Sequence, residues 1–432
     1  MKTRSMKRKA GSVRQLAVAV LVLVGLVDLA EGREWTVTAG EDALSSTLEQ
    51  TEPGDVVRLG PGTHAGPVTL SRPVELIGEP GARLVGDGTG SVVTITAEDI
   101  TVSGLDISGS GSSHETIDSG IKATKTAKRA RIIGNRLEKN LYGIDIHGAL
   151  DTLARGNTII GRQDHRMNSR GNGIYVWNAP GSVVEANQVR YGRDGLFVNI
   201  SHDNIFRDNR FEDLRFAVHY MHTQDSEISG NISRNNHVGY AMMFSRGLVI
   251  RANQSIGDRD HGIMLNYAVD AVVEGNLVRG GGEKCLFMYN ANKNRIVDNR
   301  FESCQIGIHF TAGSERNQIS GNAFIGNRTQ VKYVASRWVE WSVEGRGNYW
   351  SDHAAFDIDG DGRADMPYRP NDLIDHVLWT QPAARLLLGS PAVQLIRWTQ
   401  SKFPSLLPGG VVDSNPLMKP SPAIGAGKDG RT

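Results

Sequence analysis

The sequence predicts an all-β protein, a right-handed parallel β-helix with coils of about 22 residues. The first observation behind this prediction is a series of asparagines spaced 22 or 23 residues apart, with one gap of 30: Asn135, Asn157, Asn187, Asn209, Asn231, Asn253, Asn276, Asn299 and Asn322. The second is a small residue eight or nine positions after most of these asparagines: Gly143, Gly173, Gly195, Ala217, Gly239, Gly262, Cys285 and Gly307. A repeat of this length indicates units that bury their apolar faces only against their neighbours.

The third observation is that each repeat contains short segments in which apolar residues alternate with polar ones. Ile296–Phe301 and Gly173–Val176 are examples, and both are too short for helices but suit β-strands. Strands of successive coils stack at about 4.8 Å, so equivalent side chains form ladders along the tube. An asparagine in such a ladder can hydrogen-bond the amides of its neighbours and tolerates the left-handed backbone of a tight corner. We therefore predict that the repeated asparagines are structural.

The first 32 residues have the pattern of a targeting segment. A basic start is followed by the apolar stretch Leu16–Val27 and by small residues near Ala30. We expect a cleaved signal and an exported protein, although Asp28 interrupts a simple cleavage consensus and leaves an uncleaved anchor as the alternative. This segment holds six of the 48 basic and two of the 47 acidic residues, so the remainder has 42 basic against 45 acidic side chains. That balance argues against a nucleic-acid partner.

The rest of the chain divides by its repeat pattern. Residues 33–120 are predicted to form an N-terminal cap and irregular first coils, and residues 121–335 the regular coils. The gap of 30 residues places an insertion of about eight residues near 163–168. Residues 336–418 are predicted to hold a C-terminal cap, an acidic loop and an apolar docking segment, and residues 419–432 a disordered tail.

Two cysteines, Cys285 and Cys304, fall on adjacent coils. An exported protein permits a disulfide between them. Their positions differ by one coil and by three residues along it, which can exceed the limit of about 7 Å between the Cα atoms of a disulfide. The sequence therefore leaves this bond open.

The residues that follow each small residue alternate between the core and the surface. Positions one and three beyond it are apolar and are predicted to point inward, as in Ile174 and Val176. Positions two and four are predicted to point outward and to form one continuous strip along the tube. The outward pairs are Asp145 and His147, Tyr175 and Trp177, Phe197 and Asn199, His219 and Met221, Ala241 and Met243, Met264 and Asn266, Phe287 and Tyr289, and His309 and Thr311. A long exposed strip of aromatic, methionine and histidine side chains predicts an interaction surface.

Within this strip, Met221, Met243 and Met264 lie near His219 and His222. Thioether and imidazole ligands together suit the soft ion Cu(I) better than Zn²⁺ or Ca²⁺. These five residues are therefore candidates for transient Cu(I) binding. The alternative is an oily patch that binds a partner protein and no metal. The sequence has no tight cluster of Cys and His that would indicate a closed, permanent metal centre.

A second candidate metal site lies near the C-terminus. Asp357, Asp359, Asp361 and Asp365 occupy positions 1, 3, 5 and 9 of a loop that has glycine at position 6. This spacing matches the front of a Ca²⁺-binding loop, in which oxygen ligands converge around a sharp turn. Position 12 is Tyr368, where such loops carry glutamate, so a bidentate ligand must come from elsewhere. We expect a structural Ca²⁺ site, with a solvated acidic turn as the alternative.

Parallel β-helices also occur among enzymes that cleave or epimerise acidic polysaccharides. Polyuronate lyase or epimerase chemistry needs carboxylates together with Arg or Lys, which neutralise a uronate and supply a base. The candidate clusters are Asp164–Arg166, Arg193–Asp194 and Asp258–His261. Each cluster also fits a solvated corner of a coil, so an enzyme of this kind is the alternative function.

Motifs in the C-terminal third resemble one known family. They are Gly347–Asp352, the acidic loop with Met366–Tyr368, Gly389–Val393, and the apolar segment from Phe403 through Gly409–Leu417. The order and spacing of the apolar residues over 386–417 are the most specific feature. In these motifs, and over nearly all of its length after the targeting segment, the chain is similar to the NosD family of exported accessory proteins for maturation of nitrous-oxide reductase.

The resemblance implies a periplasmic protein that works with a membrane ABC transporter and a copper chaperone to build the copper centres of nitrous-oxide reductase. It implies a scaffold without hydrolytic or redox activity of its own. It supplies no ligand set, so the copper candidates rest on the outward strip alone.

Overall fold

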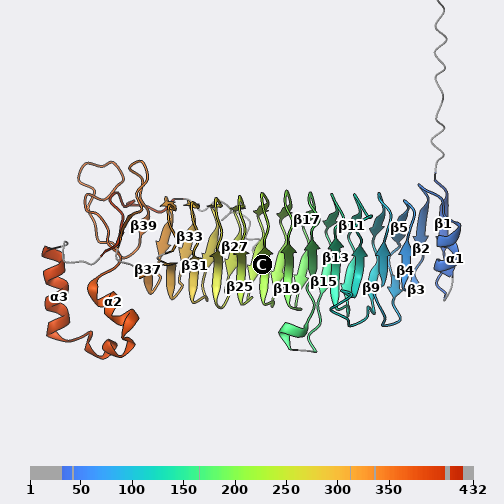
Figure 1. The fold of residues 1–432 in the computed structure, drawn as a ribbon, viewed down its shortest axis with the longest axis horizontal. Helices are drawn as coiled ribbons and strands as arrows, with labels where there is room; N and C mark the ends of the chain where they lie inside the picture. Colours follow the sequence, from blue (N-terminus) through green and yellow to red (C-terminus); the bar gives the residue numbers. More distant parts are fainter. Residues whose placement is uncertain are drawn as a thin grey trace, which may run out of the picture. The chain divides into compact units, whose positions relative to one another are not determined.

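The computed structural model describes residues 32–40, 43–164, 166–311, 313–334, 337–403 and 409–421. These residues form the right-handed parallel β-helix that the sequence predicts (Figure 1). In each coil the chain passes from the first sheet to the second and then to the third, and equivalent strands of neighbouring coils pair in parallel. The predicted targeting segment, apart from Gly32, and the end of the predicted tail lie outside the described residues.

The first sheet has 13 strands: β1 (Glu34–Val37), β2 (Val56–Leu59), β5 (Glu75–Gly78), β8 (Thr101–Ser103), β11 (Arg131–Ile133), β14 (Leu153–Arg155), β17 (Val183–Glu185), β20 (Ile205–Arg207), β23 (Glu227–Ser229), β26 (Val249–Arg251), β29 (Val272–Glu274), β32 (Arg295–Val297) and β35 (Gln318–Ser320). The second has 13: β3 (Gly62–Ala65), β6 (Ala82–Val85), β9 (Asp106–Ser108), β12 (Arg136–Glu138), β15 (Thr158–Ile160), β18 (Gln188–Arg190), β21 (Arg210–Glu212), β24 (Ile232–Arg234), β27 (Gln254–Ile256), β30 (Leu277–Arg279), β33 (Arg300–Glu302), β36 (Ala323–Ile325) and β39 (Tyr349–Trp350). The third has 12: β4 (Val68–Leu70), β7 (Val93–Ile95), β10 (Ser119–Ala123), β13 (Tyr142–His147), β16 (Ile174–Trp177), β19 (Asp194–Asn199), β22 (Phe216–Met221), β25 (Val238–Met243), β28 (His261–Asn266), β31 (Lys284–Tyr289), β34 (Ile306–Thr311) and β37 (Thr329–Val334).

The repeated asparagines form one continuous ladder inside the corner between the first and second sheets. Asn209 is representative, because its side-chain amide donates to the carbonyl of Val184 on the preceding coil (2.9 Å) and to Oδ1 of Asn231 on the next (2.9 Å). That same Oδ1 also accepts from the backbone N–H of Asn209 (3.0 Å). Each asparagine therefore satisfies polar groups that the corner would otherwise bury without partners. The structural role predicted for these residues is confirmed.

The left-handed backbone predicted for these asparagines falls instead on the residue before each of them. Gly156 has a φ of 65°, Ala186 of 54° and Asp208 of 56°. The preceding residue turns the chain, which leaves the asparagine free to direct its side chain along the stack. This part of the prediction was wrong by one position.

The core consists of the inward-facing residues of the three sheets. The positions predicted to point inward from the third sheet are all buried: Ile144, Ile146, Ile174, Val176, Leu196, Val198, Val218, Tyr220, Tyr240, Met242, Ile263, Leu265, Leu286, Met288, Ile308 and Phe310. Burial of each aliphatic or aromatic side chain contributes about 1.5–3 kcal/mol before entropy is counted. The alternation that places these residues inside also fixes which residues of the third sheet face outward.

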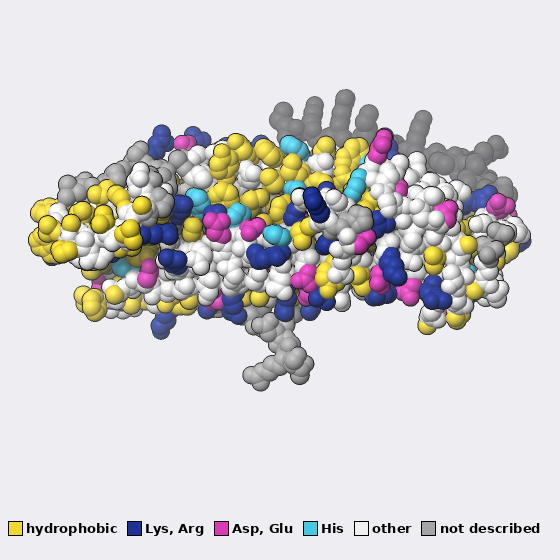
Figure 2. Space-filling view, turned by 90° about the horizontal axis from the view of Figure 1, so that it is seen from below, with side chains coloured by type: hydrophobic (Ala, Val, Ile, Leu, Met, Phe, Trp, Pro, Cys, Tyr) yellow, Lys and Arg dark blue, Asp and Glu magenta, His cyan; other side chains and the backbone are white. Residues whose placement is uncertain are grey.

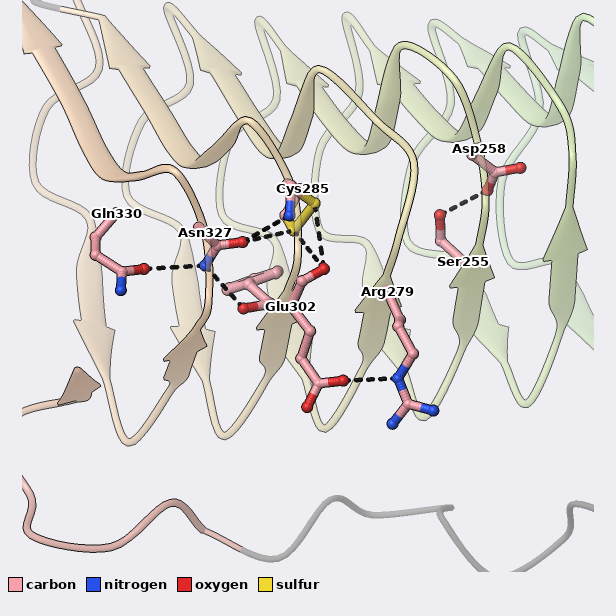
Figure 3. The surroundings of a disulfide bond; sticks show 9 residues. Ser255, Asp258, Arg279, Cys285, Glu302, Asn327 and Gln330 are labelled. Carbon is pink, nitrogen blue, oxygen red and sulfur yellow. Dashed lines mark hydrogen bonds and ion pairs between the residues drawn. A yellow bond between two sulfur atoms is a disulfide. The ribbon is translucent and has the colours of Figure 1, made fainter. Parts of the chain in front are cut away.

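Cys285 and Cys304 form a disulfide, with their Cα atoms 5.7 Å apart (Figure 3). Cys304 lies in the corner that follows β33, where its backbone N–H donates to Oδ1 of Asn327 on the next coil (2.9 Å). Because the chain turns at this corner, the three intervening residues do not add up to a lateral displacement along one strand. The sequence spacing alone did not decide whether the disulfide forms, and in the structure the turn at this corner brings the two cysteines within bonding distance.

The same corner holds a buried carboxyl group, that of Asp258, two coils before Cys304. Asp258 accepts hydrogen bonds from Ser233 Oγ and Ser255 Oγ (both 2.6 Å) and from the backbone N–H of Asn236 (2.8 Å). Burial raises the pKa of Asp258 to about 6, although these donors oppose the shift. Asn236 and Asn327 occupy equivalent positions as neutral amides. Asp258 is therefore a titratable group in a place that elsewhere holds an uncharged one.

Both ends of the coil stack are covered. The helix α1 (Ala43–Gln50) buries Leu44 at the first coils. At the other end, Trp341 and Trp350 are buried with ring centroids 6.1 Å apart. The short strands β38 (Trp338–Glu340) and β40 (Gly410–Val412) pair beside them.

The remaining elements are η1 (Met167–Ser169) in the insertion, and α2 (Leu373–Thr380), η2 (Pro382–Leu387) and α3 (Pro391–Lys402). Among the residues described, no helix is long and apolar enough to cross a membrane.

Replacing one ladder asparagine with alanine is expected to destabilise the fold. Asn231 donates to the carbonyl of Phe206 (2.9 Å) and to Asn253 Oδ1 (3.0 Å), so Asn231→Ala leaves buried polar groups unpaired. We expect the free energy of unfolding in urea to fall by about 3 kcal/mol. The control Gln188→Ala removes an exposed side chain of β18 and should cost less than about 0.5 kcal/mol. Equal effects of the two substitutions would contradict a structural ladder.

Asp258→Asn is expected to change how stability depends on pH. The pKa of Asp258 is raised to about 6 in the folded protein, so its contribution is complete below the unfolded pKa near 3.8 and is lost as the pH rises through 6. Urea unfolding should show the variant gaining stability relative to the wild type as the pH rises from about 4 to about 6, by up to about 3 kcal/mol in all, with little further change above about pH 7. A difference that stays constant, or shrinks with rising pH, would show that the carboxyl group is not protonated in the corner.

Candidate metal and partner-binding surface

The outward residues of the third sheet lie in two parallel columns. Column I contains Asp145, Tyr175, Phe197, His219, Ala241, Met264, Phe287 and His309, and column II contains His147, Trp177, Asn199, Met221, Met243, Asn266, Tyr289 and Thr311. Neighbouring members of each column pair in register, one coil apart. Figure 2 shows hydrophobic side chains with interspersed histidines along one side of the coil region.

The aromatic members of column I stack on one another. The ring of Tyr175 lies 5.2 Å from that of Phe197, and Phe197 lies 4.7 Å from His219, with nearly parallel planes in both pairs. Ala241 then interrupts the stack, because it has no ring to continue it. Further along the column, the ring centroids of Phe287 and His309 are 5.1 Å apart.

Met221, Met243 and Met264 lie on the outer face and are half-buried, as the alternation implies. The inward methionines Met242 and Met288 are fully buried. Three column I residues, Asp145, His219 and Ala241, are buried although they point outward. An outward alanine with no exposed surface must be covered by the longer side chains of adjoining positions. The strip is therefore more closely packed than the sequence pattern predicts.

His219 is fixed by a buried ion pair. Its Nδ1 lies 3.1 Å from Asp194 Oδ2, and Arg215 donates to both oxygens of the same carboxylate (2.7 and 2.6 Å). Burial alone would raise the pKa of Asp194, but the hydrogen bonds from His219 and Arg215 outweigh it and hold the pKa below the ordinary value. Asp194 is fully buried and is thus a carboxylate that accepts from both partners.

Asp194 reaches the outer face because the strand is irregular at the following glycine. Asp194 pairs with Phe216 and Leu196 with Val218, but Gly195 has no partner in this register. The residue before the glycine therefore adds a third line of outward side chains, which alternation alone does not reveal. The signal in the sequence is the small residue that marks each coil.

The other ring nitrogen of His219 is unusual. Nε2 is buried and has no hydrogen-bond partner among the described residues, and His219 as a whole is 9% exposed. In the neutral imidazole, the carboxylate at Nδ1 favours the tautomer with the proton on Nδ1, which leaves a lone pair on Nε2. A carboxylate that orients a histidine in this way is typical of metal-binding imidazoles. The donor chemistry therefore fits a soft metal ion.

His222 lies outside both columns, on an exposed ladder at the corner beyond them. It stacks on Phe244 (5.3 Å), which stacks on Tyr267 (5.0 Å). His222, Phe244 and Tyr267 have φ values of 54°, 50° and 53°, and Ile200 at the same position has 52°. Asn178 and Asn290 hold this position on outer coils, as a left-handed corner favours. The middle coils instead keep large apolar groups in a strained and exposed place, which is typical of a binding surface.

Two further histidines line the strip as neutral imidazoles. Burial, followed by the charges of Lys332 and Lys284, lowers the pKa of His309 to about 4. Burial and Lys284 also lower the pKa of His261. The rings of His261 and His309 each lie 5.1 Å from that of Phe287, and their buried Nδ1 atoms have no hydrogen-bond partner within the described ranges. The sequence pattern placed His261 only in the candidate Asp258–His261 cluster, whereas in the structure its ring lies beside Phe287 of column I.

The acidic loop brings together three of its four predicted ligands. Asp357, Asp359 and Asp361 each place one carboxylate oxygen within 4.8 Å of the others. Asp365 is not in this group, and its Oδ2 accepts from the backbone N–H of Ile358 (2.9 Å). The loop thus has part of the arrangement that Ca²⁺ requires.

The carboxylates considered for polyuronate chemistry are mostly engaged by the protein itself. Asp194 is held by Arg215 and His219, and Asp258 is buried in its corner among serines. Asp260 is exposed and pairs with His237 (3.5 Å). Asp164 lies in the insertion, and its neighbour His165 lies outside the described residues.

The C-terminal helical segment exposes an apolar surface. Leu386 is 92% exposed, and Leu395, Trp398 and Phe403 are each more than half exposed. Hydrophobic side chains also gather at this end of the molecule in Figure 2. Such a surface exceeds what a free protein needs and indicates a contact with another molecule.

The fold and this surface define a class of protein: a rigid parallel β-helix whose outer strip combines thioether, imidazole and aromatic groups. A "Probable ABC transporter binding protein NosD" of Stutzerimonas stutzeri is 42% identical over 376 residues, covering 84% of this chain and 86% of the relative. A protein of the same name from Pseudomonas aeruginosa is 43% identical, covering 84% of this chain and 87% of its own. The family model described as "Periplasmic copper-binding protein (NosD)" matches residues 155–355. The chain belongs to the NosD family.

Solved structures share the fold at low sequence identity. The A-module of the mannuronan C-5 epimerase AlgE6 from Azotobacter vinelandii has a TM-score of 0.54 at 13% identity, covering 68% of this chain and 92% of that one. The adhesin PfbA of Streptococcus pneumoniae has a TM-score of 0.54 at 12% identity, covering 67% and 86%. An epimerase and an adhesin resemble the chain equally well, so this likeness concerns the β-helix alone.

Ile200→Asn is expected to stabilise the protein. Ile200 is 51% exposed and has a left-handed backbone, which costs a β-branched residue about 1–2 kcal/mol and asparagine less. The free energy of unfolding should rise by about 0.5–1 kcal/mol. The control Ile205→Asn changes an isoleucine that is 38% exposed in the ordinary strand β20, and it should lower stability. Destabilisation of similar size in both variants would show that burial outweighs strain at Ile200.

Proposed function

We propose that the chain is a periplasmic accessory protein for maturation of nitrous-oxide reductase, in which it assists assembly of the copper centres. Membership of the NosD family supports this proposal, since the family model describes periplasmic copper-binding proteins. The names of the two relatives support association with an ABC transporter. In this proposal the N-terminal 32 residues are a cleaved export signal, and a copper chaperone and the reductase are the further partners.

The observation that carries the proposal is the buried Nε2 of His219, which has no hydrogen-bond partner among the described residues, in a strip that also carries Met221, Met243 and Met264. An imidazole nitrogen and thioether sulfurs are ligands that Cu(I) prefers. Neutral ligands on an outer face suit an ion that is received and passed on, because they lack the thiolate charges that hold an ion in a permanent centre. Copper is thus cargo in this proposal. His222, at the edge of the strip, is available to an ion in transit.

Each of the remaining surfaces has a part in this scheme. The exposed apolar residues of η2 and α3 dock on the membrane transporter, as the relatives' names suggest. The exposed ladder of His222, Phe244 and Tyr267 contacts a partner protein that delivers or accepts the ion. The cluster of Asp357, Asp359 and Asp361 holds a structural Ca²⁺ that stiffens the C-terminal cap.

The second candidate function is polyuronate lyase or epimerase chemistry. Its support is the aromatic stack of column I, from Tyr175 to His219, which offers flat faces to sugar rings. Asp194 and Asp258 are occupied by protein donors, however, so neither is a ready base. Turnover of alginate or polygalacturonate by the purified protein would favour this alternative.

Replacing the outward methionines is expected to weaken Cu(I) binding. Leucine at Met221, Met243 and Met264 keeps the volume but removes three sulfurs, so competition with a chromophoric Cu(I) chelator should show at least a tenfold lower affinity. The control replaces the inward Met242 and Met288 with leucine, which leaves the surface unchanged. Equal affinities of the wild type and the outward triple variant would remove the strip as the copper site.

The role in maturation has its own test. A strain that lacks the gene should produce nitrous-oxide reductase with low copper occupancy, and the wild-type gene should restore it. The outward triple variant should restore it only in part. Full copper occupancy in the deletion strain would contradict the proposed function whatever the protein binds in vitro.

A further inference from the structure

Ala241 creates a gap in column I between His219 and Met264. His219 pairs with Ala241, and Ala241 with Met264, on three successive coils. The strands that carry His219 and Met264 are two coil spacings apart, which is about 10 Å. The side chains of His219 and Met264 are long enough to approach each other across the alanine between them. Met221 and Met243 flank the gap in column II as direct neighbours. We call these five residues the Ala241 notch.

The notch is closed to water. Ala241 has no exposed surface although it points outward, and His219 is 9% exposed. Met221, Met243 and Met264 are half-buried, and together with His219 they are the neighbours of Ala241 within the two columns. An ion in the notch would therefore have protein groups as its ligands and not bulk water.

His219 cannot turn away from the notch. Asp194 and Arg215 fix its Nδ1 side, Phe197 stacks on one face at 4.7 Å, and Phe216 meets the ring edge-to-face at 4.8 Å. The two nitrogens of an imidazole point in roughly opposite directions, so Nε2 faces away from Asp194 and toward the side of the gap. Nε2 is buried, and no residue in the described part of the chain gives it a hydrogen-bond partner. A buried lone pair without a donor is costly unless a ligand sometimes fills its place.

The ligands of the notch suit a monovalent cation of low charge density. The thioethers and a neutral imidazole bring no charge to the ion, and the Asp194 carboxylate is held by Arg215 at 2.6 Å, with Arg193 at 3.8 Å. A carboxylate behind a histidine raises the basicity of the ligating nitrogen without contacting the ion. Cu(I) accepts a mixed nitrogen and sulfur set of low coordination number, whereas Zn²⁺ and Ca²⁺ favour harder or charged ligands.

We propose that the Ala241 notch is a single Cu(I) site, in which His219 Nε2 and the thioethers of the flanking methionines bind the ion and Asp194 is the positioning residue. This inference rests on the proposed copper-handling function and narrows it, because the cargo then binds at one place on the strip. In this proposal alanine is required at position 241 because a longer side chain would stand between His219 Nε2 and the sulfurs of the methionines.

The test fills the notch without removing a ligand. Ala241→Leu should lower Cu(I) affinity at least tenfold in chelator competition, while Thr311→Leu, which enlarges a distant column II residue, should leave it unchanged. Asp194→Asn should weaken binding about 10–100-fold. Nitrogen-15 NMR of the metal-free wild type should show His219 protonated on Nδ1, a readout that needs neither copper nor a variant. X-ray absorption of the loaded wild type should show both nitrogen and sulfur ligands.

The outcomes separate this inference from the proposed function. Two results would contradict a Cu(I) site at the Ala241 notch while leaving a role in maturation intact. One is an unchanged Cu(I) affinity in Ala241→Leu, and the other is a His219 that carries its proton on Nε2 in the metal-free protein. If the wild-type protein binds no Cu(I), both the site at the Ala241 notch and the proposal that copper is the cargo are contradicted. If Asp194→Asn does not fold, Arg215→Gln serves in its place, because it removes a carboxylate partner without removing the carboxylate.

Discussion

The asparagine ladder is the interaction on which the rest of the structure depends. Each rung joins three consecutive coils through a side-chain amide, as Asn209 does with Val184 and Asn231. Without these bonds, the corner between the first and second sheets would bury backbone groups with no partners. The ladder holds every coil at the same angle to the next. That alignment makes residues of equal position in the coil stack into straight columns.

The binding surface is a product of that alignment. No coil by itself brings an imidazole and several thioethers together, because each contributes only two or three outward residues. Stacking places His219 on one coil beside Met243 on the next and Met264 on the one after. Because the strands are held by ladder bonds on the far side of the tube, single outward residues can change without loss of the fold. The strip can therefore combine a buried ion pair, strained corners and unpaired nitrogens within a few coils.

The coil architecture could be predicted from the sequence because its signal repeats. Nine asparagines at one spacing, with apolar residues at fixed offsets, admit few other folds, and the inward and outward positions followed from alternation. The columns of methionine and histidine were predicted for the same reason. Within the coils, the sequence predicted those features that repeat with the period of the coil.

The remainder depended on local departures from the repeat. Asp194 faces outward because the strand is irregular at Gly195, and Cys304 reaches Cys285 because the chain turns between them. Ala241 appears in the sequence as one more member of a column, and its importance is visible only when its neighbours cover it. The left-handed backbone lies one residue before each asparagine, a detail that spacing cannot distinguish.

The ladder has a direction, and its last rung ends on a charge. Asn348 has no further asparagine to receive its amide, and Asp413, 65 residues later, accepts from its backbone N–H (2.7 Å) and from the indole of Trp350 (2.8 Å). All other rungs join residues about one coil apart and can form as the chain lengthens. The final rung can form only after residue 413 has been synthesised. A chain that ends before Asp413 would therefore leave the backbone N–H of Asn348 without this acceptor.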